Sequence, residues 1–317
     1  MSKQTNSKTI KTSIGGQAVI EGVMMRGPKL TALSVRMPDQ SISTEVWDTP
    51  NSNKWYKKSS KTPFIRGVFN FVESMTDGYK SLMKAAEKAG LDEEAEEPSK
   101  FEQKLRQLLG DKFMPFLQGC ILLFSLAMAL FFFAFLPTTL VGFFKDYISH
   151  PLALSALEGL TKIAILILYL ALISNMSDIK RVFMYHGAEH KTIFCYEHGE
   201  ELTVENVRKY TRFHPRCGTS FLVIVLLLSI LVSSMVSWDN LWMRVGLKVL
   251  CLPIIMSLSY ECIKFAGRHD NLFTRILSAP GLWTQRLTTR EPDDSMIEVA
   301  IASMKKVIPE NPNEALF

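Results

Sequence analysis

The residues best suited to chemistry lie in the segment "FMYHGAEHKTIF", residues 183–194. His186, Glu189 and His190 form H-x-x-E-H, the inverted form of the zincin motif. A helix places positions i and i+4 on one face, so the two imidazoles can point at one ion. Glu189 lies close enough to act as a general base on a metal-bound water or to orient a ligand. The motif therefore predicts a divalent transition metal, with zinc the best match.

A site of this kind needs a third ligand, and the sequence offers candidates nearby. His214 and Cys217 lie in "RFHPRCGTSF", and Glu261 and His269 lie farther along the chain. Four of the six histidines fall within residues 177–217, a clustering that favours a metal site. We predict His186, His190, His214 and Cys217 as the ligand set, with Glu189 as the catalytic base.

Other readings of the same residues stay open. A pattern with three fixed positions arises by chance, and Gly187 weakens the helix by roughly 1 kcal/mol, so the motif is also compatible with a polar helix that binds no metal. Cys217 alone could be a nucleophile beside a histidine, or a thiol that is only buried.

Composition indicates a membrane protein. Of the 317 residues, 47% are apolar and many stand in long unbroken runs. The net charge of +5 is modest and its basic residues are scattered, which disfavours nucleic acid as a partner. The five cysteines lack the spacing of a secreted disulfide framework, so we expect reduced thiols. Residues 1–20 contain no apolar core of a signal peptide, and the amino terminus is expected to stay in the cytosol.

Four segments have the apolar length to cross a hydrocarbon core of ~30 Å, which takes about 20 helical residues. They are residues 116–136, 157–176, 218–237 and 243–263. The fourth contains Lys248 and Pro253. We expect Lys248 to extend its ammonium towards the membrane surface, and a proline is tolerated where neighbouring helices satisfy the freed carbonyl.

The distribution of basic residues predicts the orientation of these spans. Residues 177–217 contain seven Lys and Arg and residues 264–290 contain five, whereas 137–156 contain only Lys145 and "SWDNLW" contains none. Basic connections remain cytosolic, so both termini and the H-x-x-E-H segment are predicted to face the cytosol. The small number of charges within the spans and the lack of an internal repeat disfavour a transporter.

The remaining segments are expected outside the membrane. The alternation in "ALSVRMPDQSISTEVW" predicts two strands around Pro38. Residues 64–83 carry an apolar stripe that fits a helix on the membrane surface, a helix on the cytosolic face of the bundle, or a core-packing helix. Ser295 and Glu298 form a capping box, which predicts a terminal amphipathic helix from about residue 296. The predicted divisions are a β-rich unit at 1–62, the amphipathic helix at 63–90, an acidic linker at 91–115, the bundle at 116–263 and a cytosolic segment at 264–317.

Three long segments carry a resemblance to a known family: "GGQAVIEGVMMRGP", "YHGAEHKTIFCYEHGEELTVENVRKYTRFHPRCGTSFL" and "APGLWTQRLTTREPDDSMIEVAIASM". Together they resemble the bacterial YqhQ-like membrane family, whose function is unknown and which is described as a predicted metal-dependent enzyme. The likeness runs from Gly15 to about Met304. It implies that further residues line the pocket or orient the ligands: Gln17, Glu21, Arg26, Gln285, Thr288, Thr289, Arg290 and Glu291. Arg216, beside Cys217, and Glu261, at the end of the last span, complete this predicted set.

The expected fold is mainly α, a polytopic membrane bundle of about four transmembrane helices with a small β-rich unit and amphipathic helices. The leading hypothesis is a multi-pass protein of the cell membrane whose cytosolic metal site hydrolyses a lipid-linked or peptide substrate. The rival is a non-enzymatic platform that binds a membrane-protein partner and in which the His and Cys cluster is structural. Membrane lipid is an expected partner in both. An open coordination position would favour the enzyme, and a closed shell of four ligands the platform.

Overall fold

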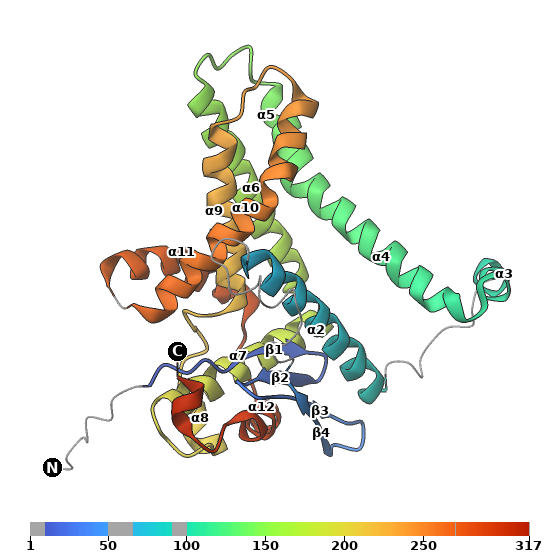
Figure 1. The fold of residues 1–317 in the computed structure, drawn as a ribbon, viewed down its shortest axis with the longest axis vertical. Coiled ribbons are helices and arrows are strands. Elements are labelled where there is room, and N and C mark those ends of the chain that lie inside the picture. Colours follow the sequence, from blue (N-terminus) through green and yellow to red (C-terminus); the bar gives the residue numbers. More distant parts are fainter. Residues whose placement is uncertain (1–9, 50–65, 91–99, 270, 317) are drawn as a thin grey trace. The chain divides into compact units, whose positions relative to one another are not determined.

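A computed structural model describes residues 10–49, 66–90, 100–269 and 271–316. The chain divides into two compact units, which are described separately. The first unit comprises residues 1–91, 169–225 and 256–317, and the second comprises residues 92–168 and 226–255. Figure 1 labels their helices and strands. The predicted acidic run and the ends of the predicted β-rich unit lie outside the described residues.

A four-stranded antiparallel sheet is the β structure of the first unit. Its strands are β1 (Gly15–Val19), β2 (Gly22–Arg26), β3 (Leu30–Arg36) and β4 (Ile42–Asp48), in the order β1-β2-β3-β4. The predicted pair of strands around Pro38 is confirmed as β3 and β4, and the preceding hairpin was not predicted. Its turn places Glu21 at φ 49°, the left-handed region that non-glycine residues seldom occupy.

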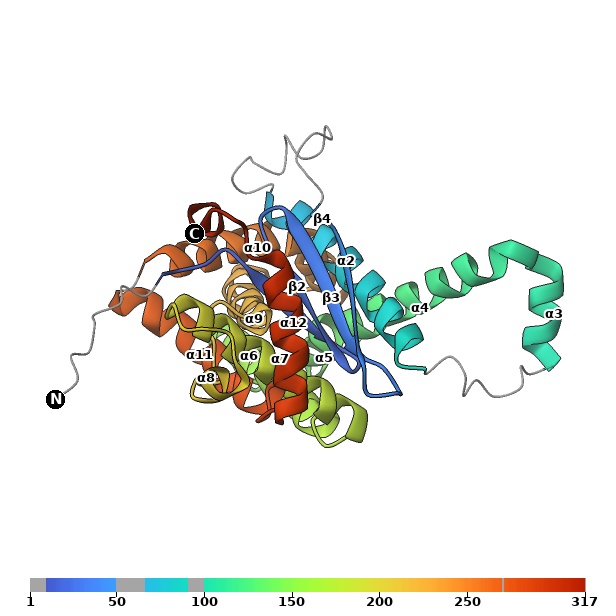
Figure 2. The ribbon, with the colours of Figure 1, turned by 90° about the horizontal axis from the view of Figure 1, so that it is seen from below.

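Helices cover both faces of this sheet. On one face, Val23, Met25 and Ala32 pack with residues of α7 (Ser177–Glu197) and α12 (Asp294–Val307). Figure 2 shows α12 lying along β2 and β3 with α7 beside it. On the other face, Leu33 packs with Ala85 of α2 (Arg66–Lys88). Because the middle strands are buried on both faces, "GVMMR" is almost uniformly apolar instead of alternating.

The helix α2 meets the unit through small residues. Its buried positions are Gly67, Gly78, Ser81 and Ala85. The predicted apolar stripe begins with Phe64 and Ile65, outside the described residues, and its members Val72, Met75, Tyr79, Leu82 and Met83 are exposed. The core-packing interpretation of the stripe is therefore wrong. The helix packs instead through its glycines and small side chains, which allow two backbones to approach closely.

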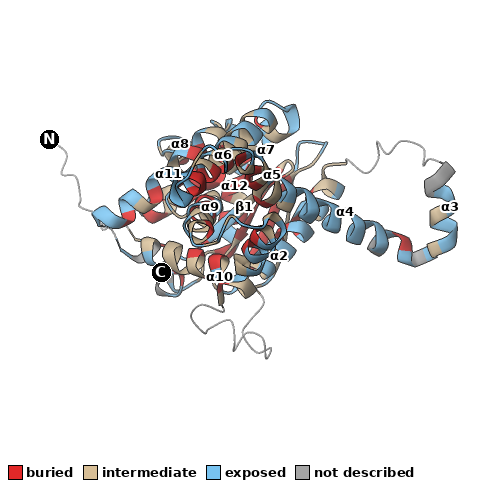
Figure 3. Cartoon of the chain, turned by 90° about the horizontal axis from the view of Figure 1, so that it is seen from above, coloured by how far each residue is buried: buried red, intermediate tan, exposed pale blue. Residues whose placement is uncertain are grey.

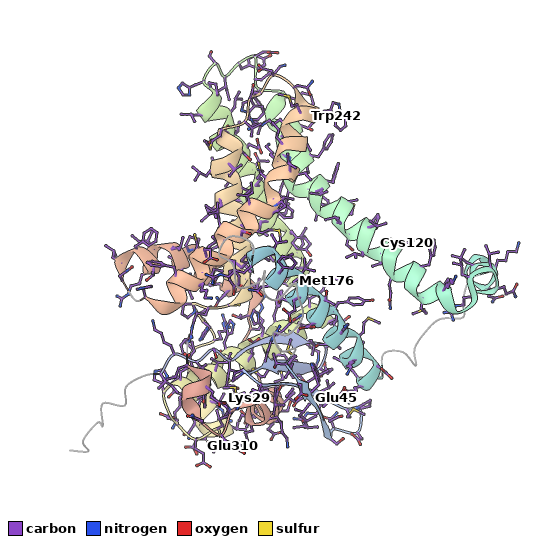
Figure 4. The ribbon with its side chains drawn as sticks, in the orientation of Figure 1. Lys29, Glu45, Cys120, Met176, Trp242 and Glu310 are labelled. Carbon is purple, nitrogen blue, oxygen red and sulfur yellow. The ribbon has the colours of Figure 1, made fainter. Side chains whose placement is uncertain are left out.

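The second unit consists of helices, most of them apolar. It contains α3 (Lys100–Leu109), a short 3-10 turn, α4 (Phe113–Leu130), a π-helical turn (Phe131–Phe135), α5 (Leu136–Gly142) and parts of α6 (Pro151–Ile173), α9 (Gly218–Ser234) and α10 (Leu241–Arg268). Figure 3 shows α4 exposed over most of its length, and Figure 4 marks the exposed Cys120 on it. An apolar helix that is exposed over most of its length is expected where a segment faces lipid.

Three helical segments in the described part of the chain are long and apolar enough to cross a membrane: Phe116–Gly142, Pro151–Ile173 and Leu241–Ala266. The prediction of four is corrected at α9, which has 17 helical residues. At 1.5 Å per residue it spans about 25 Å, less than a typical hydrocarbon core. Pro253 lies inside α10, as the sequence predicted.

Two further predictions are corrected, and one helix was not predicted. Lys248 does not extend to a surface: it is 6% exposed, and its ammonium contacts Glu158 and Thr138. The last helix begins at Asp294, not near residue 296, and its N-cap is Asp293, whose carboxylate accepts from Met296 N at 3.0 Å. An aspartate is as good an N-cap as the serine of the predicted capping box. The connection after the last span contains an unpredicted helix, α11 (Leu272–Thr288), capped by Asn271.

Candidate metal centre

Two histidines and a cysteine of the first unit converge. His186 and His190 stand one turn apart on α7, which lies beside β1 (Figures 1 and 2), and Cys217 immediately precedes α9. One ligand atom from each lies within 4.8 Å of the others, the only such group of His, Cys, Asp or Glu found in the described part of the chain. His186 Nε2 lies 3.1 Å from Cys217 Sγ, and the two imidazole centroids are 4.4 Å apart.

Backbone carbonyls orient both imidazoles. His186 Nδ1 donates to Thr288 O at 2.8 Å, and His190 Nδ1 donates to Arg212 O at 2.5 Å. A carbonyl can only accept, so each Nδ1 carries a proton, and Nε2 is the nitrogen available to a cation. Histidines that bind metals are held in this way, with the distal N–H donated to a carbonyl or carboxylate.

Cys217 is held in a setting that favours the thiolate. Thr219 N donates to its sulfur at 3.4 Å at the start of α9, where a helix end favours negative charge. Burial raises the pKa of Cys217, but the charges of His186 and His190 lower it further, to well below its ordinary value. Burial likewise lowers the pKa of His186, while the Cys217 thiolate and then Glu189 raise it to about 9. The thiolate and the imidazolium thus stabilise each other.

Glu189 is a buried carboxylate with an unsatisfied oxygen. It is 5% exposed, and its Oε2 has no hydrogen-bond partner in the part of the chain that the structure describes. Burial raises its pKa, and the charges of His186 and His190 oppose that shift. The carboxyl group faces β1, where a Cβ added at Gly16 would lie 3.0 Å from Glu189 Cδ. An orphaned buried oxygen is costly, so this group needs an explanation.

Gly187, inside the motif, has a packing role that the sequence did not reveal. A Cβ at this position would lie 2.1 Å from Arg290 O, so the chain after α11 crosses α7 in direct contact with it. Arg290 N donates to Phe183 O at 2.8 Å and fixes this crossing. The same crossing supplies the Thr288 carbonyl to His186.

His214 lies outside the converging group, although it was predicted as a ligand together with Cys217. Its Nε2 lies 3.6 Å from Glu197 Oε2, and its ring centroid is 4.5 Å from that of Phe194. Burial lowers its pKa. Gln285 holds its backbone, donating to His214 O at 2.7 Å and accepting from His214 N at 2.8 Å. His269 is exposed and stacks on Phe265 at 4.3 Å, also outside the group.

The remaining predicted pocket residues fall into two sets. Thr288 and Gln285 hold the group as described, and Thr289, which is fully buried, donates to Gln285 O at 2.7 Å. The others make ion pairs or contacts of their own: Arg216 with Glu197, Glu21 with Arg181, Arg26 with Glu73 and Asp77, Glu261 with Arg66, Glu291 with Lys191, and Gln17 against Gly78.

A cavity lies on the β1 side of the first unit. Its volume is about 430 Å³, and its lining includes Gly15, Gly16, Gln17 and Arg26. Gly16 therefore lines the cavity and also faces the carboxyl group of Glu189. The family resemblance pointed to this glycine-rich segment, whereas the residue types alone gave it no role in chemistry.

Comparison with known proteins identifies the family. The profile of the family described as "Protein of unknown function (DUF1385)" matches residues 62–310. The chain is also 35% identical over 301 residues to "Uncharacterized protein YqhQ" of Bacillus subtilis (strain 168), covering 94% of this chain and 93% of that protein. No solved structure matches. The chain therefore belongs to the DUF1385 family, together with YqhQ of Bacillus subtilis.

Proposed function

We propose that this chain is an integral membrane, metal-dependent hydrolase, with His186, His190 and Cys217 as metal ligands and Glu189 as general base. The observation that carries the proposal is the buried convergence of two oriented imidazoles and a thiolate beside an orphaned carboxylate. Burying such a cluster without a cation leaves charged groups poorly compensated.

The donor set fits zinc. Two imidazole nitrogens and one thiolate are a combination that zinc accepts, and three protein ligands leave one position open, as in catalytic zinc sites. Bound there, zinc would supply Lewis-acid polarisation of a carbonyl or phosphoryl oxygen and would acidify water. Because the imidazolium and thiolate now pair with each other, binding the ion would release the proton from His186 Nε2.

Glu189 is suited to the proton transfer. It lies one turn from His186 and adjoins His190 on α7, yet its Oε2 makes no hydrogen bond with the described residues. A cavity adjoins β1, the strand that this carboxyl group faces, and Gly16 lines it. The three apolar helices favour a substrate at a membrane, either lipid-linked or a peptide. The basic connections favour a cytosolic site with both termini on the same side.

The second candidate function is a membrane platform with a structural metal. It is favoured by the number of segments that meet around the group, since the loops at Arg212 and Thr288 both depend on the histidines. In this case the ion would hold these segments together, and Glu189 would not act as a base.

One experiment separates these functions. Zinc X-ray absorption of the purified full-length chain reports the ligands, and complementation of a strain lacking the protein reports function. The hydrolase predicts that Glu189→Gln retains the metal and its shell of two nitrogens and one sulfur but loses function. Retention of both metal and function would leave the platform. A chain that retains function after complete chelation would favour a Cys217 nucleophile paired with His186.

A further inference from the structure

Four charged side chains are buried together in the second unit. Glu158 and Lys162 stand one turn apart on α6, and Arg244 and Lys248 stand one turn apart on α10. Their side chains are between 0% and 7% exposed. Both helices are among those apolar enough to cross a membrane, where ionisable side chains are rare and mark functional sites.

One carboxylate faces three cations in this cluster. Lys162 Nζ lies 2.8 Å, Lys248 Nζ 2.5 Å and Arg244 Nη2 2.9 Å from an oxygen of Glu158. If all four groups are ionised, the cluster carries two positive charges in excess, from three cations less one anion. A buried charge without a counterion costs several kcal/mol, so the cluster calls for further negative charge.

Part of that charge comes from the end of α9. Arg244 donates to the carbonyl oxygens of Ser233, Val236 and Ser237, which are the last acceptors of α9 and its connection. A helix carboxyl end is equivalent to roughly half a negative charge. The guanidinium also stacks on Trp238, 3.7 Å from the ring centroid. With all four groups ionised, more than one positive charge therefore stays unbalanced by the groups described in this unit.

A cavity of about 240 Å³ adjoins the cluster. Arg244 lines it from the cluster side, and the exposed Lys145 lines it from the connection after α5. Asp239 also lines it and accepts from the Ser237 hydroxyl. Counting the cluster and the lining together gives four cations and two carboxylates, so the cavity keeps a positive excess.

We propose that this cavity binds a phosphate-type anion. A phosphate carries one or two negative charges, which matches the excess. Lys145 is the lining cation that would contact it, whereas Arg244 contributes its charge, because its N–H groups already donate to Glu158, Ser155 and the α9 carbonyls. The lining includes the exposed, apolar Phe143, and Leu241 also lines the cavity at the start of α10. Trp242, labelled in Figure 4, follows Leu241 and is exposed. Such surroundings suit a phosphate carried by a lipid, and a free phosphate ion shares the same chemistry.

The test uses the full-length chain in a phosphorus-free detergent. Native mass spectrometry measures binding of phosphatidylglycerol and of diacylglycerol, which lacks the phosphate, and calorimetry with inorganic phosphate tests the free ion. Loss of one charge-assisted contact, worth about 1.5–3 kcal/mol, should weaken phosphatidylglycerol binding by about tenfold or more in Lys145→Gln. Lys112→Gln removes another exposed lysine of the same unit and should leave binding unchanged.

Asp239→Asn, at an exposed carboxylate that lines the cavity, supplies a change of opposite sign. It raises the excess positive charge by one, so anion binding should tighten, a result that a purely structural cluster would not give. If the chain binds phosphatidylglycerol more tightly than diacylglycerol and Lys145→Gln removes this preference, the ligand is a phosphate carried by a lipid. If the chain binds inorganic phosphate and Lys145→Gln weakens that binding, the ligand is the free ion. Equal binding of the two lipids without phosphate binding, or equal effects of Lys145→Gln and Lys112→Gln, would overturn the proposal.

Discussion

Replacement of Gly187 by alanine tests how the chain crosses the H-x-x-E-H helix. The new Cβ would lie 2.1 Å from Arg290 O, where ordinary contact begins at 3.4 Å, so the crossing must move by about 1.3 Å, the difference between the two. That movement strains two hydrogen bonds, Arg290 N to Phe183 O and His186 Nδ1 to Thr288 O, each 2.8 Å long.

The magnitude follows from opposing terms. Overpacking costs about 1–3 kcal/mol and each weakened hydrogen bond about 1 kcal/mol, whereas alanine gains about 1 kcal/mol of helix propensity over glycine. We expect a net loss of about 2–4 kcal/mol, measured by thermal unfolding of the purified chain, and a zinc affinity about 10–100-fold weaker, because an orienting bond of a ligand is lost. Gly246→Ala, a helical glycine whose Cβ would meet nothing within 4 Å, is the control. Equal stabilities of the two variants would refute the close crossing.

Three further substitutions test the surroundings of the site. In Gly16→Ala the new Cβ would lie 2.8 Å from Met24 O, 2.9 Å from Met25 Sδ and 3.0 Å from Glu189 Cδ. This variant should lower the unfolding temperature by an overpacking cost of about 1–3 kcal/mol, whereas Gly15→Ala, with open space, should not. Gln285→Leu strips both hydrogen bonds from the backbone of His214 and should lower the urea midpoint by an equivalent of about 2–6 kcal/mol; an unchanged midpoint would show that the loop is held otherwise. Burial raises the pKa of Glu197, but His214 and then Arg216 lower it below its ordinary value of 4.5. Near and below this pH the folded chain therefore binds fewer protons than the unfolded chain. The ionised Glu197 thus stabilises the fold fully at pH values above 4.5. Glu197→Gln should therefore be less stable than wild type at pH 7, and the difference should shrink as the pH falls below 4.5 and through the lower pKa of the folded chain. A difference independent of pH would contradict this.

Local sequence patterns predicted the elements whose signals are contained within one segment. The strands around Pro38, the long apolar helices and the helical H-x-x-E-H segment each follow from periodicity or length. The i and i+4 spacing also placed His186 and His190 on one face, as the 4.4 Å between their rings shows. These features depend on residues that are close in sequence, so a local sequence pattern is enough to predict them.

Features that depend on distant segments were missed. The choice of Cys217 over His214 in the converging group depends on how Gln285 and Glu197 hold the loop before α9. The inward direction of Lys248 depends on Glu158, 90 residues away. The sequence did contain a signal for this buried cluster of charges. Glu158 and Lys162 share one face of α6, and Arg244 and Lys248 share one face of α10. The unpredicted burial of small residues in α2 likewise reflects a close approach that no single segment encodes.

Metal analysis of the full-length chain, purified without chelator, tests the central claim most directly. We predict one zinc or other transition-metal ion per chain in the wild type and in His214→Ala, because His214 lies outside the converging group. We predict its loss in His186→Ala, His190→Ala and Cys217→Ala, because two remaining ligands rarely hold the ion. A metal-free wild type, or a Cys217→Ala variant that keeps its metal while His214→Ala loses it, would contradict the account.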